Sequence, residues 1–135
     1  MCSKVIAIID DDEVFQLLTR KMIEQKNIAD KILQFLNPLS GLSFLKNNVN
    51  DFSKLPSVIF LDLYMPEMNG WQFLSQLENL NFTHKYEPSV FVVSGADSID
   101  FEKMRNYRLI KGYLAKPVPM TKLISLIESA EAINE

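Results

Sequence analysis

The sequence predicts an α/β fold in which five parallel strands form a doubly wound sheet with helices on both faces. Short, β-branched apolar runs alternate five times with segments whose apolar residues recur at helical spacing. Acidic, hydroxyl or basic residues directly follow four of these runs, as expected where parallel strands end at one edge of a sheet. Right-handed crossovers are the expected connections.

The first strand and helix are expected at residues 4–9 and 11–25. Residues 4–9 read KVIAII, a run typical of a strand that is covered on both faces. Acids at the start of 11–25 suit the positive end of a helix dipole, and an apolar stripe at helical spacing favours an amphipathic helix. That stripe consists of Val14, Leu17, Leu18, Met22 and Ile23.

The other four strand and helix pairs follow the same pattern, with proline and glycine in the loops between them. Strands are expected at 31–36, 58–61, 89–93 and 112–115. Helices are expected at 39–46, at 71–80, from an N-cap at Asp97 or Ser98 to about residue 107, and at 121–133.

Composition restricts the class of protein. The length of 135 residues suits one domain, and a net charge of −3 lacks the basic face that nucleic acids or anionic membranes require. Cys2 is the only cysteine, which excludes an internal disulfide and a cysteine-based zinc site. No apolar run could span a bilayer. We therefore expect a single domain over residues 1–135, without an output domain, in the cytoplasm.

Two adjacent acids, Asp10 and Asp11, lie where the first strand gives way to its helix. Crowded carboxylates repel each other unless a cation neutralises them, and Mg²⁺ prefers oxygen ligands of this kind. A solvated acidic helix start is the alternative interpretation.

Asp62, Ser94 and Lys116 end three further predicted strands. A carboxylate at the end of a buried strand is costly without a partner, so a purely structural Asp62 is disfavoured. Beside a bound cation it could attack phosphorus and become an aspartyl phosphate. An ammonium such as that of Lys116 suits a phosphoryl oxygen or a carboxylate, although serine and lysine are also common in turns and on surfaces.

The combination resembles the receiver domains of two-component response regulators, including the single-domain chemotaxis type. The motifs IIDDD, IFLDLYMPEMNG, VVSG and GYLAKP occur in the family's order with near-family spacing, and the resemblance covers the whole chain. It implies a flavodoxin-like sheet with strand order 2-1-3-4-5. It also implies a phosphoacceptor signalling domain that catalyses only its own phosphorylation and dephosphorylation.

The resemblance implies a role for each site residue. Asp62 would accept a phosphoryl group from a phosphohistidine on a sensor histidine kinase or a histidine phosphotransfer protein, with Mg²⁺ as cofactor. The implied metal ligands are Asp10, Asp11, Asp62 and the backbone carbonyl of Tyr64. Ser94 would be the switch hydroxyl, Lys116 the phosphate contact, Tyr113 the switch aromatic and Gly70 the loop glycine. Output would pass to a downstream protein or by onward phosphotransfer, without nucleic acid or membrane.

Four positions add detail to this resemblance. Gly95 replaces the family's usual small residue such as alanine, and Asp12 is a third acid to which we assign no separate role. In the resembled fold, Tyr64 and Ala96 would flank the water path to the phosphoryl group, and neither side chain offers a carboxylate or amide to orient an attacking water. We therefore expect slow dephosphorylation.

Two rival functions remain open from the sequence. A haloacid-dehalogenase-type phosphatase would use Asp10 as nucleophile and Asp12 as acid, but it accounts poorly for Asp62. A receiver that binds partners without phosphorylation would retain the same residues. His84, in a polar stretch, is expected to be a loop residue rather than a ligand.

Overall fold

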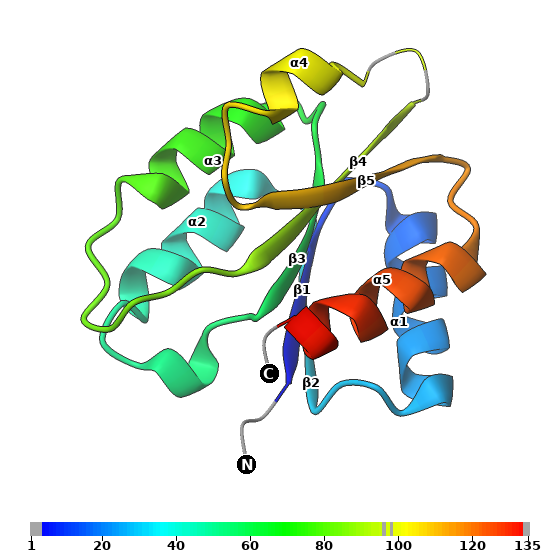
Figure 1. Cartoon of the computed structure of the whole chain (residues 1–135), viewed down its shortest axis with the longest axis horizontal. Coiled ribbons are helices and arrows are strands. Elements are labelled where there is room, and N and C mark those ends of the chain that lie inside the picture. Colours follow the sequence, from blue (N-terminus) through cyan, green and yellow to red (C-terminus); the bar gives the residue numbers. More distant parts are fainter. Residues whose placement is uncertain (1–3, 96, 98, 134–135) are drawn as a thin grey trace.

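The computed structural model describes residues 4–95, 97 and 99–133, with side chains through residue 130. A central parallel sheet separates two layers of helices (Figure 1). Helices α1 (Glu13–Lys26) and α5 (Met120–Ile133) cover one face of the sheet, and α2 (Pro38–Asn47) and α3 (Gly70–Glu78) cover the other. Within the described part of the chain, no helix has the length and apolar character needed to cross a membrane.

The sheet has five strands in the order β2-β1-β3-β4-β5, all parallel, which confirms the predicted fold and strand order. The strands are β1 Val5–Ile9, β2 Lys31–Phe35, β3 Val58–Asp62, β4 Ser89–Gly95 and β5 Ile110–Lys116. Strands β1 and β3 are buried along their whole length, as their β-branched runs predict. Because all strands run in one direction, their carboxyl ends share one edge.

The helices begin at side chains that cap them. Asp12 caps α1, Asn37 caps α2, and Asn69 forms a capping box with Gln72 at the start of α3. A short 3₁₀ helix, η1 (Phe52–Lys54), precedes β3.

Each layer of helices buries its own hydrophobic core against the sheet. Beneath α2 and α3 the core includes Leu42, Leu45, Trp71, Phe73 and Leu74. Beneath α1 and α5 it includes Phe15, Ile23, Phe60, Phe91, Leu123 and Ile127. Together these two cores pack the helices against both faces of the sheet.

The predicted apolar stripe of α1 is wrong in its orientation. Val14, Leu17 and Leu18 are 66%, 52% and 51% exposed. The buried residues of α1 are Phe15, Gln16, Thr19 and Ile23, and of these Ile23 alone belongs to the predicted stripe. The Gln16 side chain donates hydrogen bonds to backbone carbonyls beneath the helix. The face of α1 that packs on the sheet therefore contains both polar and apolar residues.

The fourth helix is also shorter than predicted. Helix α4 spans Phe101–Met104, and its N-cap is Asp100, whose carboxylate accepts a hydrogen bond from the Lys103 amide. After Met104 the backbone bonds connect residues three apart, so the chain continues in 3₁₀-like turns rather than as an α-helix to residue 107. Asp97 does not cap the helix, and Ser98 lies outside the described residues.

Candidate functional site

The strand ends bring the predicted acids together. Asp10 follows β1 and Asp62 ends β3, the strand paired with β1. Carboxylate oxygens of Asp10, Asp11 and Asp62 all lie within 4.8 Å of one another. Asp10 and Asp62 are buried and Asp11 is exposed, so the cluster opens to solvent on one side.

Backbone contacts fix the position of Asp10. Its N–H donates to the carbonyl of Phe35 at the end of β2 (3.0 Å), and its Oδ1 accepts the N–H of Asp12 (2.9 Å). Asp12, to which the sequence assigned no role, also accepts the N–H groups of Val14 and Phe15 and so starts α1. The turn between strand and helix is therefore built by two of the three consecutive aspartates.

Lys116 reaches the acids from β5, the strand at the far edge of the sheet. Its Nζ lies 3.0 Å from Oδ2 of Asp10, and it also hydrogen-bonds Oδ1 of the same carboxylate at 3.3 Å. Oδ2 of Asp12 is 3.7 Å away and Oδ2 of Asp62 is 3.9 Å away. Burial alone would lower the pKa of Lys116, but these carboxylates raise it, so the group carries its charge.

Burial raises the pKa values of the two buried acids. Burial, and next the negative charge of Asp10, raise the pKa of Asp62 from 3.8 to about 7. Burial likewise raises the pKa of Asp10. Lys116 alone does not offset the burial and mutual repulsion of these groups. A cluster of three carboxylates whose charge is incompletely neutralised fits a hard divalent cation such as Mg²⁺. This ion binds protein carboxylates and keeps other coordination positions for water or phosphate.

The loop after Asp62 is closely fitted to it. Oδ1 of Asp62 accepts the N–H of Tyr64 (3.1 Å), and the Gly70 N–H donates to the carbonyl of Leu63 (2.9 Å). A Cβ on Gly70 would lie 2.9 Å from the backbone oxygen of Asp62. The predicted loop glycine is thus required by close backbone approach.

Ser94 and Tyr113 lie on the two strands beyond Asp62. Ser94 is buried at the end of β4, one residue after Val93, the register partner of Asp62. Its hydroxyl has no hydrogen-bond partner among the described residues. The Tyr113 ring on β5 meets the edge of Phe101 at 5.0 Å and the ammonium of Lys122 at 5.2 Å. A buried hydroxyl without a partner is suited to an incoming acceptor such as a phosphoryl oxygen.

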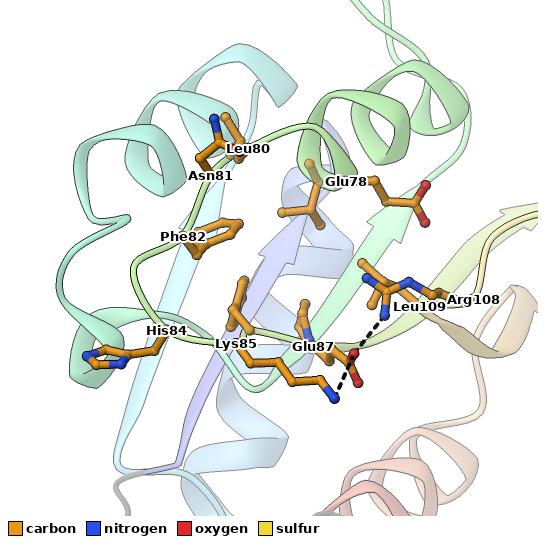
Figure 2. A pocket seen from close by; sticks show the side chains of 12 residues that line it. Glu78, Leu80, Asn81, Phe82, His84, Lys85, Glu87, Arg108 and Leu109 are labelled. Atoms are coloured by element: carbon orange, nitrogen blue, oxygen red, sulfur yellow. Dashed lines mark hydrogen bonds and ion pairs between the residues drawn. The ribbon is translucent and has the colours of Figure 1, made fainter.

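A cavity lies at the opposite edge of the sheet, where the strands begin, and it is separate from the acidic cluster. Figure 2 shows this cavity of about 290 Å³ before the starts of β4 and β5, where Glu87 pairs with Lys85 and Arg108. His84 is exposed in the loop between α3 and β4, as the sequence predicted. The chemistry therefore concentrates at the carboxyl ends of the strands.

Known proteins resemble the whole of this chain. A family model described as the response regulator receiver domain matches residues 6–128. The sensor histidine kinase CheAY of Helicobacter pylori is 29% identical over 92% of this chain, and the response regulator Rcp1 of Synechocystis is 23% identical over 96%. The chain spans 14% of the length of CheAY and 87% of that of Rcp1. A probable C4-dicarboxylate response regulator, DctR of Priestia megaterium, is 26% identical, and the chain spans half of it.

Solved structures share the fold. A two-component response regulator from Cytophaga hutchinsonii superposes with a TM-score of 0.80 at 22% identity, over the full length of both chains. The receiver domain of Francisella response regulator 1452 gives 0.77 at 21% identity, covering 98% of this chain and 99% of the other.

Proposed function

Because the chain belongs to the response regulator receiver domains of two-component systems, we propose that Asp62 is its phosphoacceptor. The observation that carries this proposal is the position of the Asp62 carboxylate. It ends a buried central strand, lies within 4.8 Å of two further carboxylates and is 3.9 Å from an ammonium. The arrangement supports phosphoryl transfer better than the phosphatase alternative, because in that case Asp62 would have no role and Asp12 is engaged in capping α1.

The proposed reaction forms one bond and breaks one. A carboxylate oxygen of Asp62 attacks the phosphorus of a phosphohistidine, and the bond from phosphorus to the histidine nitrogen breaks. The ammonium of Lys116, already beside Asp10 and Asp62, balances charge on the phosphoryl oxygens. Mg²⁺, held by Asp10, Asp11, Asp62 and the carbonyl of Tyr64, would supply the remaining positive charge. The chain would thus catalyse only its own phosphorylation and dephosphorylation.

The proposed switch begins at Ser94. Its hydroxyl has no partner among the described residues and would donate to a phosphoryl oxygen. Movement of the strand end would then release Tyr113 to turn toward it. Because α4 is a single turn packed on Tyr113 through Phe101, this surface would change with phosphorylation.

The phosphodonor is proposed to be a protein, a sensor histidine kinase or a histidine phosphotransfer protein in the cytoplasm. The exposed side chains of Val14 and Leu18 and the segment after Lys116 line a cavity of about 440 Å³ that also contains Asp12. An apolar surface directly beside the acidic cluster suits a helical protein that presents its histidine to Asp62. Output would pass to a protein partner or by onward phosphotransfer.

The decisive experiment is incubation with acetyl phosphate and Mg²⁺, followed by intact mass measurement. Wild-type protein should gain one phosphoryl group, and Asp62→Asn or added EDTA should prevent the gain. Equal labelling of the Asp62→Asn variant would overturn the assignment. Steady turnover of a small phosphomonoester would indicate the phosphatase, and a folded protein that is never labelled would indicate an adaptor receiver.

A further inference from the structure

We propose that Gln16 is a positioning residue that holds the Asp10–Asp11 pair in the geometry needed for cation binding. This inference rests on the proposed function, because it assumes that the acid pair holds Mg²⁺. Gln16 lies on α1, one turn after the acids, and it is 4% exposed. Sequence patterns do not predict a positioning role for Gln16, because a glutamine within a helix ordinarily faces solvent.

The Gln16 amide reaches the ends of two strands at once. Its Nε2 lies 3.0 Å from the carbonyl oxygen of Ile8, 3.1 Å from that of Asp10 and 3.0 Å from that of Phe35. The Phe35 carbonyl also accepts the N–H of Asp10. The end of β1 is therefore joined to the end of β2 both directly and through Gln16.

This contact acts on Asp11 through the peptide plane. The carbonyl of Asp10 belongs to the planar peptide unit that also contains the nitrogen and Cα of Asp11. Because that unit is rigid, a hydrogen bond that holds the Asp10 oxygen also sets the position of the Asp11 backbone. On the other side, the N–H of Asp12 is held by the Asp10 carboxylate. Asp11 is exposed, and these two neighbouring contacts hold the backbone that carries its carboxylate.

A chain of polar side chains fixes the orientation of the amide. Oε1 of Gln16 accepts from Nε2 of Gln34 (3.0 Å), and Oε1 of Gln34 accepts from Arg20 (3.1 Å). The reversed amide would place its oxygen against three carbonyl oxygens, so only the present orientation is satisfied. Partners of this kind behind metal ligands commonly tune metal affinity by a factor of ten or more.

The test compares Mg²⁺ binding by isothermal titration calorimetry in wild type and Gln16→Met. Methionine keeps the volume and removes the donor. We expect the dissociation constant for Mg²⁺ to rise roughly tenfold or more. The phosphorylation rate should recover when Mg²⁺ is raised to saturation. In metal-free protein, amide exchange at Asp12 should also become faster, a readout that needs no cation.

Two controls separate positioning from general support of the fold. Gln34→Met removes the outer link but leaves the three carbonyl contacts of Gln16, so it should change Mg²⁺ affinity by less than Gln16→Met. Ile127→Val shortens a buried side chain of α5 and lowers stability without touching the acids, so Mg²⁺ affinity should be unchanged. If Gln16→Met does not fold, Gln16→Asn, whose shorter amide cannot span both strand ends, is measured against the same criterion.

The outcomes separate a failure of this inference from a failure of the proposed function on which it rests. Wild-type binding with an unchanged dissociation constant in the folded Gln16 variant would overturn the positioning role alone. A wild-type protein that binds no Mg²⁺ would overturn the proposed function and the positioning role with it.

Discussion

Lys116 and Asp10 are 106 positions apart in the sequence, yet the ammonium nitrogen of Lys116 lies 3.0 Å from Oδ2 of Asp10. The contact joins the edge strand β5 to the interior strand β1, past the carboxyl ends of β3 and β4. In the absence of a cation, Lys116 is the positive charge nearest to the buried acids among the described residues. It therefore holds together a site whose carboxylates repel each other.

Replacing Lys116 should destabilise the metal-free protein. We expect Lys116→Met to lower the free energy of unfolding by about 1–2 kcal/mol in EDTA, because two buried carboxylates lose a partner that is itself partly exposed. Urea denaturation measures the change. Saturating Mg²⁺ should reduce the difference, and phosphorylation by acetyl phosphate should become slower.

Lys111→Met is the matched control for this variant. Lys111 lies on the same strand, and its ammonium donates to the backbone carbonyl of Arg108 in an exposed position. A loss of stability in Lys111→Met equal to that in Lys116→Met would contradict the role given to the buried contact.

Stability of the metal-free protein should fall as pH rises from about 4 to about 7. The pKa of Asp62 is about 7 in the folded chain against 3.8 ordinarily, so in this range the unfolded chain releases a proton that the folded chain keeps. The stabilisation is complete below pH 4 and is lost by the time the pH has passed 7. The loss amounts to on the order of 4 kcal/mol, because one pKa unit corresponds to about 1.4 kcal/mol.

Asp62→Asn should weaken this pH dependence, and the part that remains should come from Asp10, whose pKa burial also raises. In EDTA the variant should be more stable than wild type at pH 8 and nearly equal to it at pH 4, as measured by urea denaturation. The exposed Glu128→Gln is the control and should follow the wild-type curve. A wild-type stability that is flat or rises between pH 5 and 7 would argue against a proton held at Asp62.

The strand ends could be predicted from the sequence because the signal there is local and strong. A β-branched apolar run predicts a buried strand, and an acid that ends the run, such as Asp10 or Asp62, must then lie at the carboxyl edge of a parallel sheet. Strand order and the convergence of Lys116 on Asp10 required the family resemblance, because apolar runs alone do not say which strands are neighbours.

The orientation of α1 could not be predicted, because apolar periodicity assumes that only apolar groups are buried. Gln16 and Thr19 face the sheet, and Leu17 and Leu18 face solvent. Gln16 is buried since backbone carbonyls at the strand ends need donors, a demand that arises from tertiary structure. Helix α4 is also shorter than predicted, because its N-cap is Asp100 rather than the expected Asp97 or Ser98, and the helix ends at Met104.

The Phe101 ring should restrain Tyr113. Phe101 is 54% exposed and meets the Tyr113 ring edge to face at 81°, a contact worth about 0.5–1.5 kcal/mol. We expect Phe101→Ala to increase the rotamer exchange of Tyr113 in unphosphorylated protein, observed by ¹⁹F NMR of fluorotyrosine. Phe52→Ala removes a similar edge contact, with Tyr86 near the opposite edge of the sheet, and should leave the Tyr113 signal unchanged. The same change in both variants would mean that Phe101 supports only general stability.

The phosphoryl group on Asp62 should be long-lived. Tyr64 lies two residues after Asp62 and is 57% exposed, and its N–H donates to the Asp62 carboxylate, so the residue adjoins the proposed phosphoryl site. Ala96, the other predicted flank, lies outside the described residues. Neither side chain has a carboxylate or amide with which to orient water.

Replacing both flanks with groups that orient water should shorten this lifetime. After removal of acetyl phosphate, intact mass measured over time should show phosphorylated wild type decaying about tenfold more slowly than the Tyr64→Asn, Ala96→Glu variant, since oriented acid or base groups accelerate such steps by at least this factor. Tyr64→Phe keeps the ring and should decay at the wild-type rate. Loss from wild type that is as fast as from the double variant would show that another group positions the water.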